Sequence, residues 1–262
     1  AYVSAVGQDD FGKVNLDRLS SDGVDISAVR VDDQLPTGHA FVRYRPDGNR
    51  DFVYNITHSA SGTVHMSAEA KAVFAEAGHL HVVGNSLFTD DLRSMAETVA
   101  RQVKARGGTV SFDPNLRKEM LRQPGLQDAI EKVLDYTDVF LPSGDELFLG
   151  VDTTDVDEAI QAHLKRGMKV IVHKRGDEGA TYYDGQTVLT QKPFPADEVD
   201  PTGAGDCFGG AFVTLWLAGE EPTEALRLAA AAGALAVMKR GPMSGAEHAD
   251  TVRAFADKHA AA

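Results

Sequence analysis

The chain has 262 residues, and 26 basic against 39 acidic residues give a formal charge of −13, which argues against nucleic acid as the main partner. A single cysteine, Cys207, excludes an intramolecular disulfide framework and favours a reducing, cytoplasmic location. No apolar run is long enough to span a membrane, and the length suits one large domain over residues 1–262.

The first elements in chain order are a short apolar strand at Tyr2–Val6 and an amphipathic helix after it. Residues 29–56 have a different pattern. Around Phe41 apolar and charged residues alternate, and residues 46–49 favour a turn. This pattern predicts a β-hairpin lid within the single domain.

Strand and helix patterns alternate after Ser67. We expect a hairpin around Asp184-Gly185 and three helical segments after Gly205. Alternation of this kind predicts an α/β fold, a three-layer α/β/α sandwich with a mostly parallel central sheet. The expected strands of that sheet are His79–Gly84, Thr109–Asp113, Val139–Leu141 and Lys169–His173, with helices ending near Arg106, Tyr136 and residue 166.

A small-residue turn opens directly into an apolar helix in the segment 200–210, Asp-Pro-Thr-Gly-Ala-Gly-Asp-Cys-Phe-Gly-Gly. The first turn of a helix has unpaired amides and the positive end of the helix dipole, so it can hold an anion. Gly203, Ala204 and Gly205 would leave those amides open to a phosphate. Asp206 at the same place would weaken phosphate binding, so its presence needs another reason. Accepting the proton of a hydroxyl that attacks the phosphate is such a reason. The segment therefore predicts a kinase that acts on an alcohol.

These residues resemble the second signature of the ribokinase-like (PfkB) carbohydrate kinases, and the similarity runs from Val6–Gly12 to the last helix. Nearest are the members that act on fructose, tagatose or 2-keto-3-deoxygluconate. The resemblance implies ATP and Mg²⁺, Asp206 as the base, and amides of 203–206 that hold the transferring phosphoryl group. It also implies Thr202 on the nucleotide side.

The segment 113–117, Asp-Pro-Asn-Leu-Arg, follows a predicted strand. It resembles the family's Asp-Pro-Asn-x-Arg motif, which implies that Asp113 and Asn115 shape the substrate floor. Arg117 would meet the substrate or the moving phosphate, for which a guanidinium fork is suited. The alternative is a βα turn with an aspartate cap and a surface arginine.

Glu146 matches the glutamate of the family's Asn-x-x-Glu motif, with Ser143 in place of the asparagine. By resemblance Glu146 would bind Mg²⁺ through water, and the alternative is an acidic first turn of a helix. Lys174, Gly176 and Gly179 resemble the nucleotide-side loop. The remaining nucleotide-side candidate, Ala230, aligns with a position where the family usually has an asparagine near the adenine.

The hairpin should contact the sugar, with Arg43, Tyr54 and Asn55 as candidates. The stretch after Tyr54 has no arginine for a substrate carboxylate, which favours an uncharged keto-sugar. A nucleoside kinase is the alternative enzyme, although the lid has few aromatic residues to stack on a base. Resemblance also implies a possible homodimer through the lid.

The family's first βαβ unit, about 30 residues or more, has no counterpart before Tyr2. We expect the chain as given to turn over weakly or not at all, which leaves a nucleotide-binding fragment without catalysis as a further alternative.

Four other patterns carry no function in our interpretation. Gly7–Val14 has Walker A spacing but lacks the final hydroxyl, and the 203–209 glycines are not followed by the strand that a dinucleotide fold needs. His79 and His81 lack a third ligand nearby, and Cys207 is read as a small helix residue.

Overall fold

The computed structural model describes residues 1–44, 50–116 and 123–260. The chain divides into two compact units. The first comprises residues 1–80, 86–108 and 119–129, and the second comprises 81–85, 109–118 and 130–262. Within the described residues, no helix combines the length and the apolar character that crossing a membrane requires.

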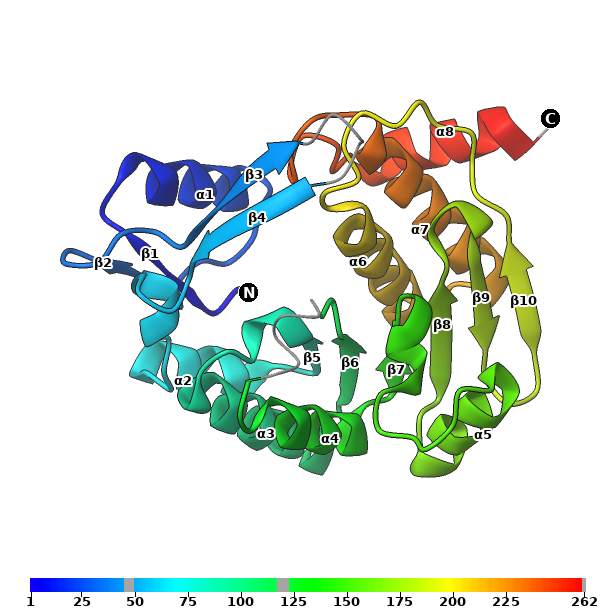
Figure 1. Ribbon diagram of the computed structural model, residues 1–262, viewed down its shortest axis with the longest axis horizontal. Coiled ribbons are helices and arrows are strands. Elements are labelled where there is room, and N and C mark those ends of the chain that lie inside the picture. Colours follow the sequence, from blue (N-terminus) through cyan, green and yellow to red (C-terminus); the bar gives the residue numbers. More distant parts are fainter. Residues whose placement is uncertain (45–49, 117–122, 261–262) are drawn as a thin grey trace. The chain divides into compact units, whose positions relative to one another are not determined.

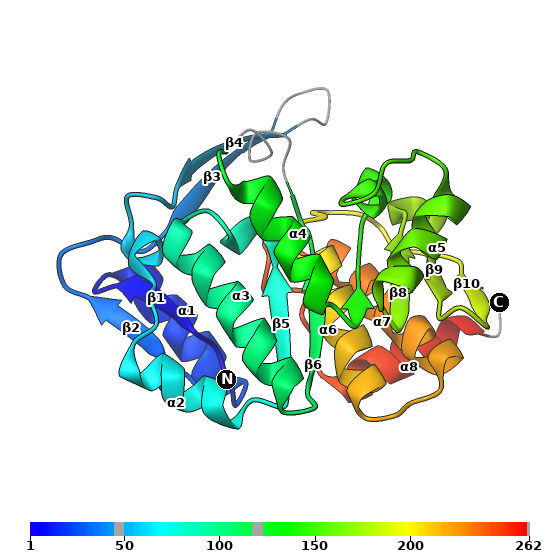
Figure 2. The same ribbon diagram turned by 90° about the horizontal axis from the view of Figure 1, so that it is seen from below.

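The first unit begins with β1 (Ser4–Gly7) and α1 (Asp10–Ser21), followed by β2 (Val29–Asp32). β2 pairs in parallel with β1, and both lie beside α1 (Figure 2). Asp9 caps α1, since its Oδ1 accepts from the Gly12 amide at 2.8 Å. The strand and helix predicted for this region are therefore confirmed, and β2 is an addition to them.

The predicted hairpin is confirmed as β3 (His39–Tyr44) and β4 (Arg50–Asn55), which pair in antiparallel register. It is shorter than the expected range 29–56, because residues 29–32 pair with β1 instead. The predicted turn at 46–49 lies outside the described residues. Three helical segments complete the first unit or lead out of it: η1 (Ala60–Thr63), α2 (Ala68–Glu76) and α3 (Asp90–Ala105).

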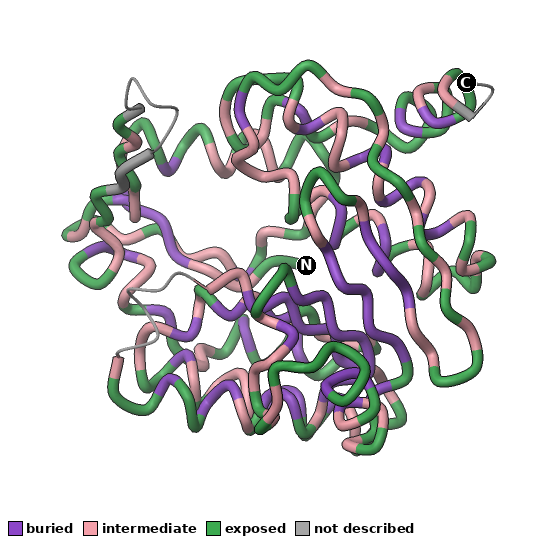
Figure 3. The backbone as a smooth tube through the Cα atoms, turned by 45° about the vertical axis from the view of Figure 1, so that its right-hand side comes forward, coloured by how far each residue is buried: buried purple, intermediate pink, exposed green. Residues whose placement is uncertain are grey.

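The second unit is built on a sheet with the strand order β10-β9-β8-β7-β6-β5 (Figure 1). β6, β7 and β8 are parallel, whereas β9 and β10 form the antiparallel hairpin expected around residue 184. The central strands are almost fully buried, as the purple segments in Figure 3 show. The strands are β5 (His79–Val83), β6 (Thr109–Asp113), β7 (Val139–Phe140), β8 (Val170–Lys174), β9 (Ala180–Tyr183) and β10 (Val188–Gln191).

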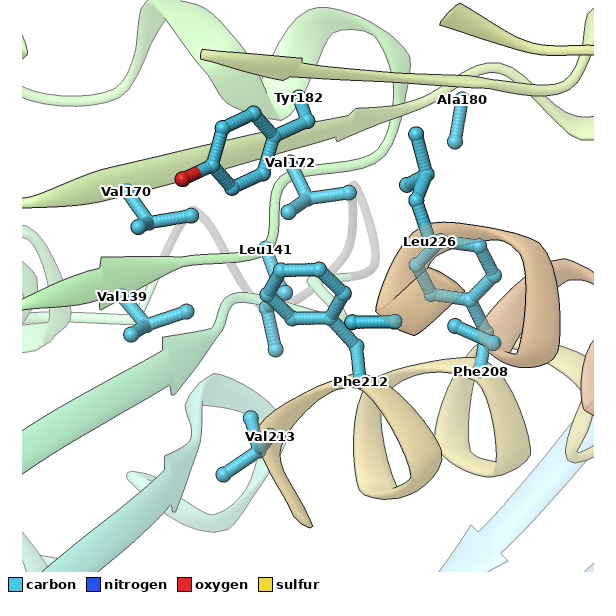
Figure 4. Packing of buried hydrophobic residues seen from close by; sticks show 12 residues of the cluster. Val139, Leu141, Val170, Val172, Ala180, Tyr182, Phe208, Phe212, Val213 and Leu226 are labelled. Carbon is cyan, nitrogen blue, oxygen red and sulfur yellow. The ribbon is translucent and has the colours of Figure 1, made fainter. Parts of the chain in front are cut away.

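Helices cover both faces of this sheet. Val139, Leu141, Val170 and Val172 point toward the helices α6 and α7 (Figure 4), whereas the next residue along β7, Phe140, meets His163 of α5 at 4.9 Å between ring centroids. Alternate residues of each strand therefore pack on opposite layers, as buried parallel strands do. The expected three-layer α/β arrangement is confirmed. The helical segments are η2 (Gly84–Ser86), α4 (Leu126–Tyr136, which begins in the first unit), η4 (Gly144–Phe148), α5 (Val156–Arg166), η5 (Gly176–Glu178), α6 (Ala204–Leu217), α7 (Pro222–Val237) and α8 (Ala249–Ala260).

Candidate active site

The helix α6 starts without a side-chain cap. Its N-cap is Gly203, which has a left-handed backbone with φ 88°. A Cβ at this position would lie 2.5 Å from the carbonyl oxygen of Pro242, so glycine is required both by conformation and by space. Ala204 and Gly205 follow in the first turn, where amides point out of the helix end. The Ala204 amide donates to the Pro201 carbonyl oxygen at 3.3 Å, and anion binding by the amides of residues 203–206 stays a prediction.

Asp200 holds the turn that leads into this helix. It is 3% exposed, and its Oδ1 accepts hydrogen bonds from the amide and the hydroxyl of Thr202 at 3.0 and 2.7 Å. Its Oδ2 accepts from the Gly241 amide at 2.9 Å. Thr202, expected on the nucleotide side, is thus fixed by Asp200. Sequence reasoning did not assign Asp200 a role, although its place at the head of the motif was visible.

Asp206 lies in the first turn of α6 and keeps solvent access. Its Oδ1 accepts from Nδ2 of Asn115 at 3.3 Å. Partial burial raises its pKa, and the neighbouring carboxylate Asp113 raises it further. Lys174, His81 and the Asn115 hydrogen bond oppose this rise. The arrangement holds a carboxylate that can take up a proton beside the open end of the helix.

Asn115 reaches Asp206 from a rarely used backbone conformation. In the described part of the chain, Asn115 is the one non-glycine residue whose φ is positive, at 40°. Asparagine tolerates this region better than most residues, and such conformations persist where the surroundings impose them. The predicted substrate residue Asn115 is thus found next to the predicted base.

Asp113 and Lys174 form an ion pair at the carboxyl ends of β6 and β8. Lys174 Nζ lies 2.5 Å from Asp113 Oδ2, and their side chains are 10% and 5% exposed. Burial is the larger influence on Asp113 and raises its pKa, while Lys174 lowers it. The expectation had assigned Asp113 to the sugar and Lys174 to the phosphates, yet the structure joins the two side chains.

Glu146 ties together two loops at the same edge of the sheet. Its Oε1 accepts from the Leu116 amide at 2.7 Å and its Oε2 from the Ser143 amide at 2.8 Å. Partial burial raises its pKa, against the effect of these two hydrogen bonds. A carboxylate has about four acceptor positions, so two remain for water. Among the described residues, no three His, Cys, Asp or Glu side chains gather into a metal site.

His81 lies close enough to Asp206 and Lys174 to interact with their charges, although the sequence analysis gave it no function. Its Nδ1 lies 2.7 Å from the Ser111 hydroxyl on the next strand. The residue keeps an exposed surface, but many protein atoms surround the ring, and this desolvation together with the Lys174 charge lowers its pKa to about 4. Its position on the strand next to β6 could have been the signal, because the strand order decides which residues meet.

The remaining candidates of the second unit are placed as follows. Gly176 is the first residue of η5 and Gly179 is its C-cap, with φ 56° and 88°, and a Cβ on Gly179 would lie 2.1 Å from the Gln191 carbonyl oxygen. Ala230 is half-buried on α7 and packs against the apolar cluster beneath α6. Their nucleotide contacts stay predictions, and Arg117 lies outside the described residues.

The hairpin candidates belong to the first unit. Tyr54 pairs with Ala40 and Asn55 with His39, while Arg43 lies two residues further along the same strand as Phe41 and His39. Because side chains alternate between faces, Arg43 and Asn55 share one face and Tyr54 lies on the other. The three residues therefore cannot all meet a ligand from one face of the hairpin, and their roles stay predictions.

Three comparisons with known proteins show which family the chain is similar to. The model of the pfkB family carbohydrate kinases matches residues 1–249. A 2-dehydro-3-deoxygluconokinase of Thermoproteus tenax is 34% identical over 247 residues, 92% of this chain and 74% of that protein. A probable fructokinase of Arabidopsis thaliana is 30% identical over 92% of this chain and 72% of its own length.

Among solved structures, an E. coli protein provisionally named Ribokinase II is 41% identical with a TM-score of 0.93, and the match covers 98% of this chain and 83% of that one. A second structure of that protein is a complex with ATP and Mg²⁺. The family match spans most of the chain and includes the segment with Asp206. The chain therefore belongs to the pfkB family of carbohydrate kinases.

Proposed function

We propose that this carbohydrate kinase transfers the γ-phosphate of ATP, in the presence of Mg²⁺, to a primary hydroxyl of a small keto-sugar of the fructose, tagatose or 2-keto-3-deoxygluconate type. The observation that carries the proposal is the Asp206 carboxylate in the first turn of α6, next to an uncapped helix start. A phosphate group fits that start, because Gly203 and Gly205 leave its amides open and the helix dipole favours an anion.

In the reaction, Asp206 accepts the proton of the sugar hydroxyl as that oxygen attacks the γ-phosphorus. The bond between the γ-phosphorus and the bridging oxygen breaks, and ADP leaves with the electron pair. Amides at the start of α6 stabilise the oxygens of the moving phosphoryl group. Asn115 keeps the carboxylate in place through its hydrogen bond. Positioning and electrostatics therefore supply most of the lowering of the barrier.

Mg²⁺, when bound, would add positive charge at the phosphate oxygens. Glu146 is the residue that would hold its water, because both carboxylate oxygens are fixed by backbone amides and keep acceptor positions. ATP as the nucleotide is supported by the kinase family and by the ATP complex of the 41% identical protein.

A coupled assay of ADP release with fructose, tagatose, 2-keto-3-deoxygluconate, ribose and adenosine tests the substrate. We expect the highest kcat/KM with fructose or tagatose, because Tyr54 is followed by no arginine that could pair with a substrate carboxylate. Preference for adenosine would favour the nucleoside kinase alternative. Ribose is included because of the protein named Ribokinase II.

The alternative without catalysis is tested in the same samples. Calorimetric binding of ATP without sugar-dependent ADP release would support a nucleotide-binding protein without catalysis. Turnover at the level usual for enzymes, about 1–10³ s⁻¹, would contradict it. Dimerisation through the hairpin and a cytoplasmic location stay predictions, and sedimentation at several concentrations measures the first.

A further inference from the structure

The pair formed by Asp113 and Lys174 lies against the first turns of α6. A Cβ added to Gly205 would lie 3.8 Å from Lys174 Nζ, and one added to Gly209 would lie 3.4 Å from Asp113 Oδ2. Gly205 precedes Asp206 in the chain, and Gly209 lies one helical turn further. The ion pair is therefore next to the proposed base, although in the described part of the chain the hydrogen bond to Asp206 comes from Asn115 and not from the pair.

If Asp113 turned toward the sugar, or Lys174 toward a phosphate, the ion pair between them would be broken. Each side chain is at least nine-tenths buried, and Lys174 Nζ donates to Asp113 Oδ2 at 2.5 Å. Breaking a buried ion pair leaves an uncompensated charge, which is strongly unfavourable. A lasting role of the pair within the protein agrees with this geometry better than separate roles on the sugar and the nucleotide.

We propose that Asp113 and Lys174 act together as positioning residues whose opposed charges set the protonation of Asp206. The inference rests on the proposed function, because it takes Asp206 as the group that accepts the hydroxyl proton. It gives both residues a role without contact to substrate.

The charged groups that face Asp206 come from three strands. Asp113 on β6 raises the pKa of Asp206, whereas Lys174 on β8 and His81 on β5 lower it. Asp113 also raises the pKa of Glu146 on η4, and Asn115 donates directly to Asp206. Since Asp113 and Lys174 are adjacent and opposite in sign, their effects on Asp206 largely cancel. Removing one of the two charges therefore leaves the effect of the other on the protonation of Asp206 uncompensated.

The test is a side-chain carboxyl NMR titration of the unliganded full chain in four forms: unchanged, Asp113→Asn, Lys174→Met and the double variant. Loss of a signal in Asp206→Asn identifies the Asp206 resonance. We expect the lowest titration midpoint in Asp113→Asn, because Lys174 then acts alone, a higher one in Lys174→Met, and an intermediate one in the double variant. An opposite charge within about 4–6 Å typically lowers the titration midpoint of a carboxyl group by about 1–3 pH units.

The acidic limb of the kcat/KM profile should move in the same order. A midpoint of Asp206 that is unchanged or higher in Asp113→Asn overturns the proposal, even if thermal stability falls, because a purely structural pair changes only stability. Should Asp113→Asn fail to fold, Asp113→Ser makes the same change of charge with less bulk. The NMR readout needs no catalysis, so it can succeed even if Asp206 proves not to be the base.

Lys169→Met is the matched control. Lys169 pairs with Asp138 at 3.1 Å in the same unit, but just before β7 and β8 and not after them. This variant removes a lysine from an aspartate–lysine pair at the other end of the strands. It should leave the Asp206 midpoint unchanged, and a shift equal to that of Lys174→Met would overturn the proposal.

Discussion

The two ends of the central strands in the second unit both carry an aspartate–lysine pair, and the two pairs differ in surroundings. At the amino end, Asp138 is fully buried, whereas the Lys169 side chain is 56% exposed. The Asp138 carboxylate also accepts from the Val110 amide at 2.9 Å, which joins it to β6. At the carboxyl end, Asp113 and Lys174 are both buried, next to the start of α6.

From this difference we expect the same two residue types to have different roles at opposite ends of a sheet. At the amino end the carboxylate joins neighbouring strands, which stabilises the fold. At the carboxyl end the pair lies beside the start of α6 and the Asp206 carboxylate, where we expect a charge to affect a bound anion and proton transfer. The following predictions separate chemistry at one end from stability at the other.

The largest expected effect is that of Asp206→Asn. Loss of a general base typically lowers kcat by about 10²–10⁴-fold, and ATP binding, measured by calorimetry, should change little. Asp138→Asn is the control at the amino end, where we expect a lower melting temperature and an unchanged kcat for folded protein. Retention of more than a tenth of the rate in Asp206→Asn would falsify the assignment of the base.

A smaller effect is expected for Gly203→Ala. The left-handed backbone and the nearby Pro242 carbonyl oxygen oppose a Cβ, so the start of α6 should shift. We expect a loss of about 1–2 kcal/mol of folding stability and a clear fall in kcat/KM for ATP.

Gly167→Ala is matched to it, because Gly167 also has a left-handed backbone, φ 112°, but no atom within 4 Å of an added Cβ. This variant should lose stability by a similar backbone strain and keep its kcat/KM. Equal falls in kcat/KM for both variants would contradict a special role of the α6 start.

The smallest effect concerns pH and stability on the α5 side of the sheet. His163 is fully buried, its Nε2 lies 2.8 Å from the Leu147 carbonyl oxygen, and burial lowers its pKa below the usual 6.5. The unfolded chain binds a proton on this ring at a higher pH than the folded chain does, so stability is lost as the pH falls below about 6.5.

Urea unfolding at pH 7.5 and pH 5.5 measures this loss, and His163→Gln should reduce the difference between the two conditions. Gln keeps a donor for the Leu147 carbonyl oxygen but does not titrate. An equal pH dependence in both proteins would mean that other groups cause it, and kcat should be unaffected by the substitution.

Local patterns were enough to predict most of the strands and helices, although residues 29–32, expected in the hairpin, pair with β1 instead. The apolar strands, the hairpin at 39–55 and the helix after Gly203 are visible in the chain, because each depends on a short repeat or on a turn residue. The kinase chemistry predicted for the segment with Gly203, Gly205 and Asp206 likewise depends on residues that are neighbours in the chain. Its resemblance to a kinase signature agrees with the family match over residues 1–249.

Tertiary structure alone decided which side chains became partners. The pairing of Asp113 with Lys174, 61 positions apart, and the approach of Asn115 to Asp206, 91 positions apart, follow from the order of the strands. No local pattern contains that order, which is also why His81 was not recognised as a neighbour of Asp206. Motifs of a few residues determined the helix start and its carboxylate, whereas the charges that tune this carboxylate are set by long-range packing, since electrostatic interactions depend on distance in space and not along the chain.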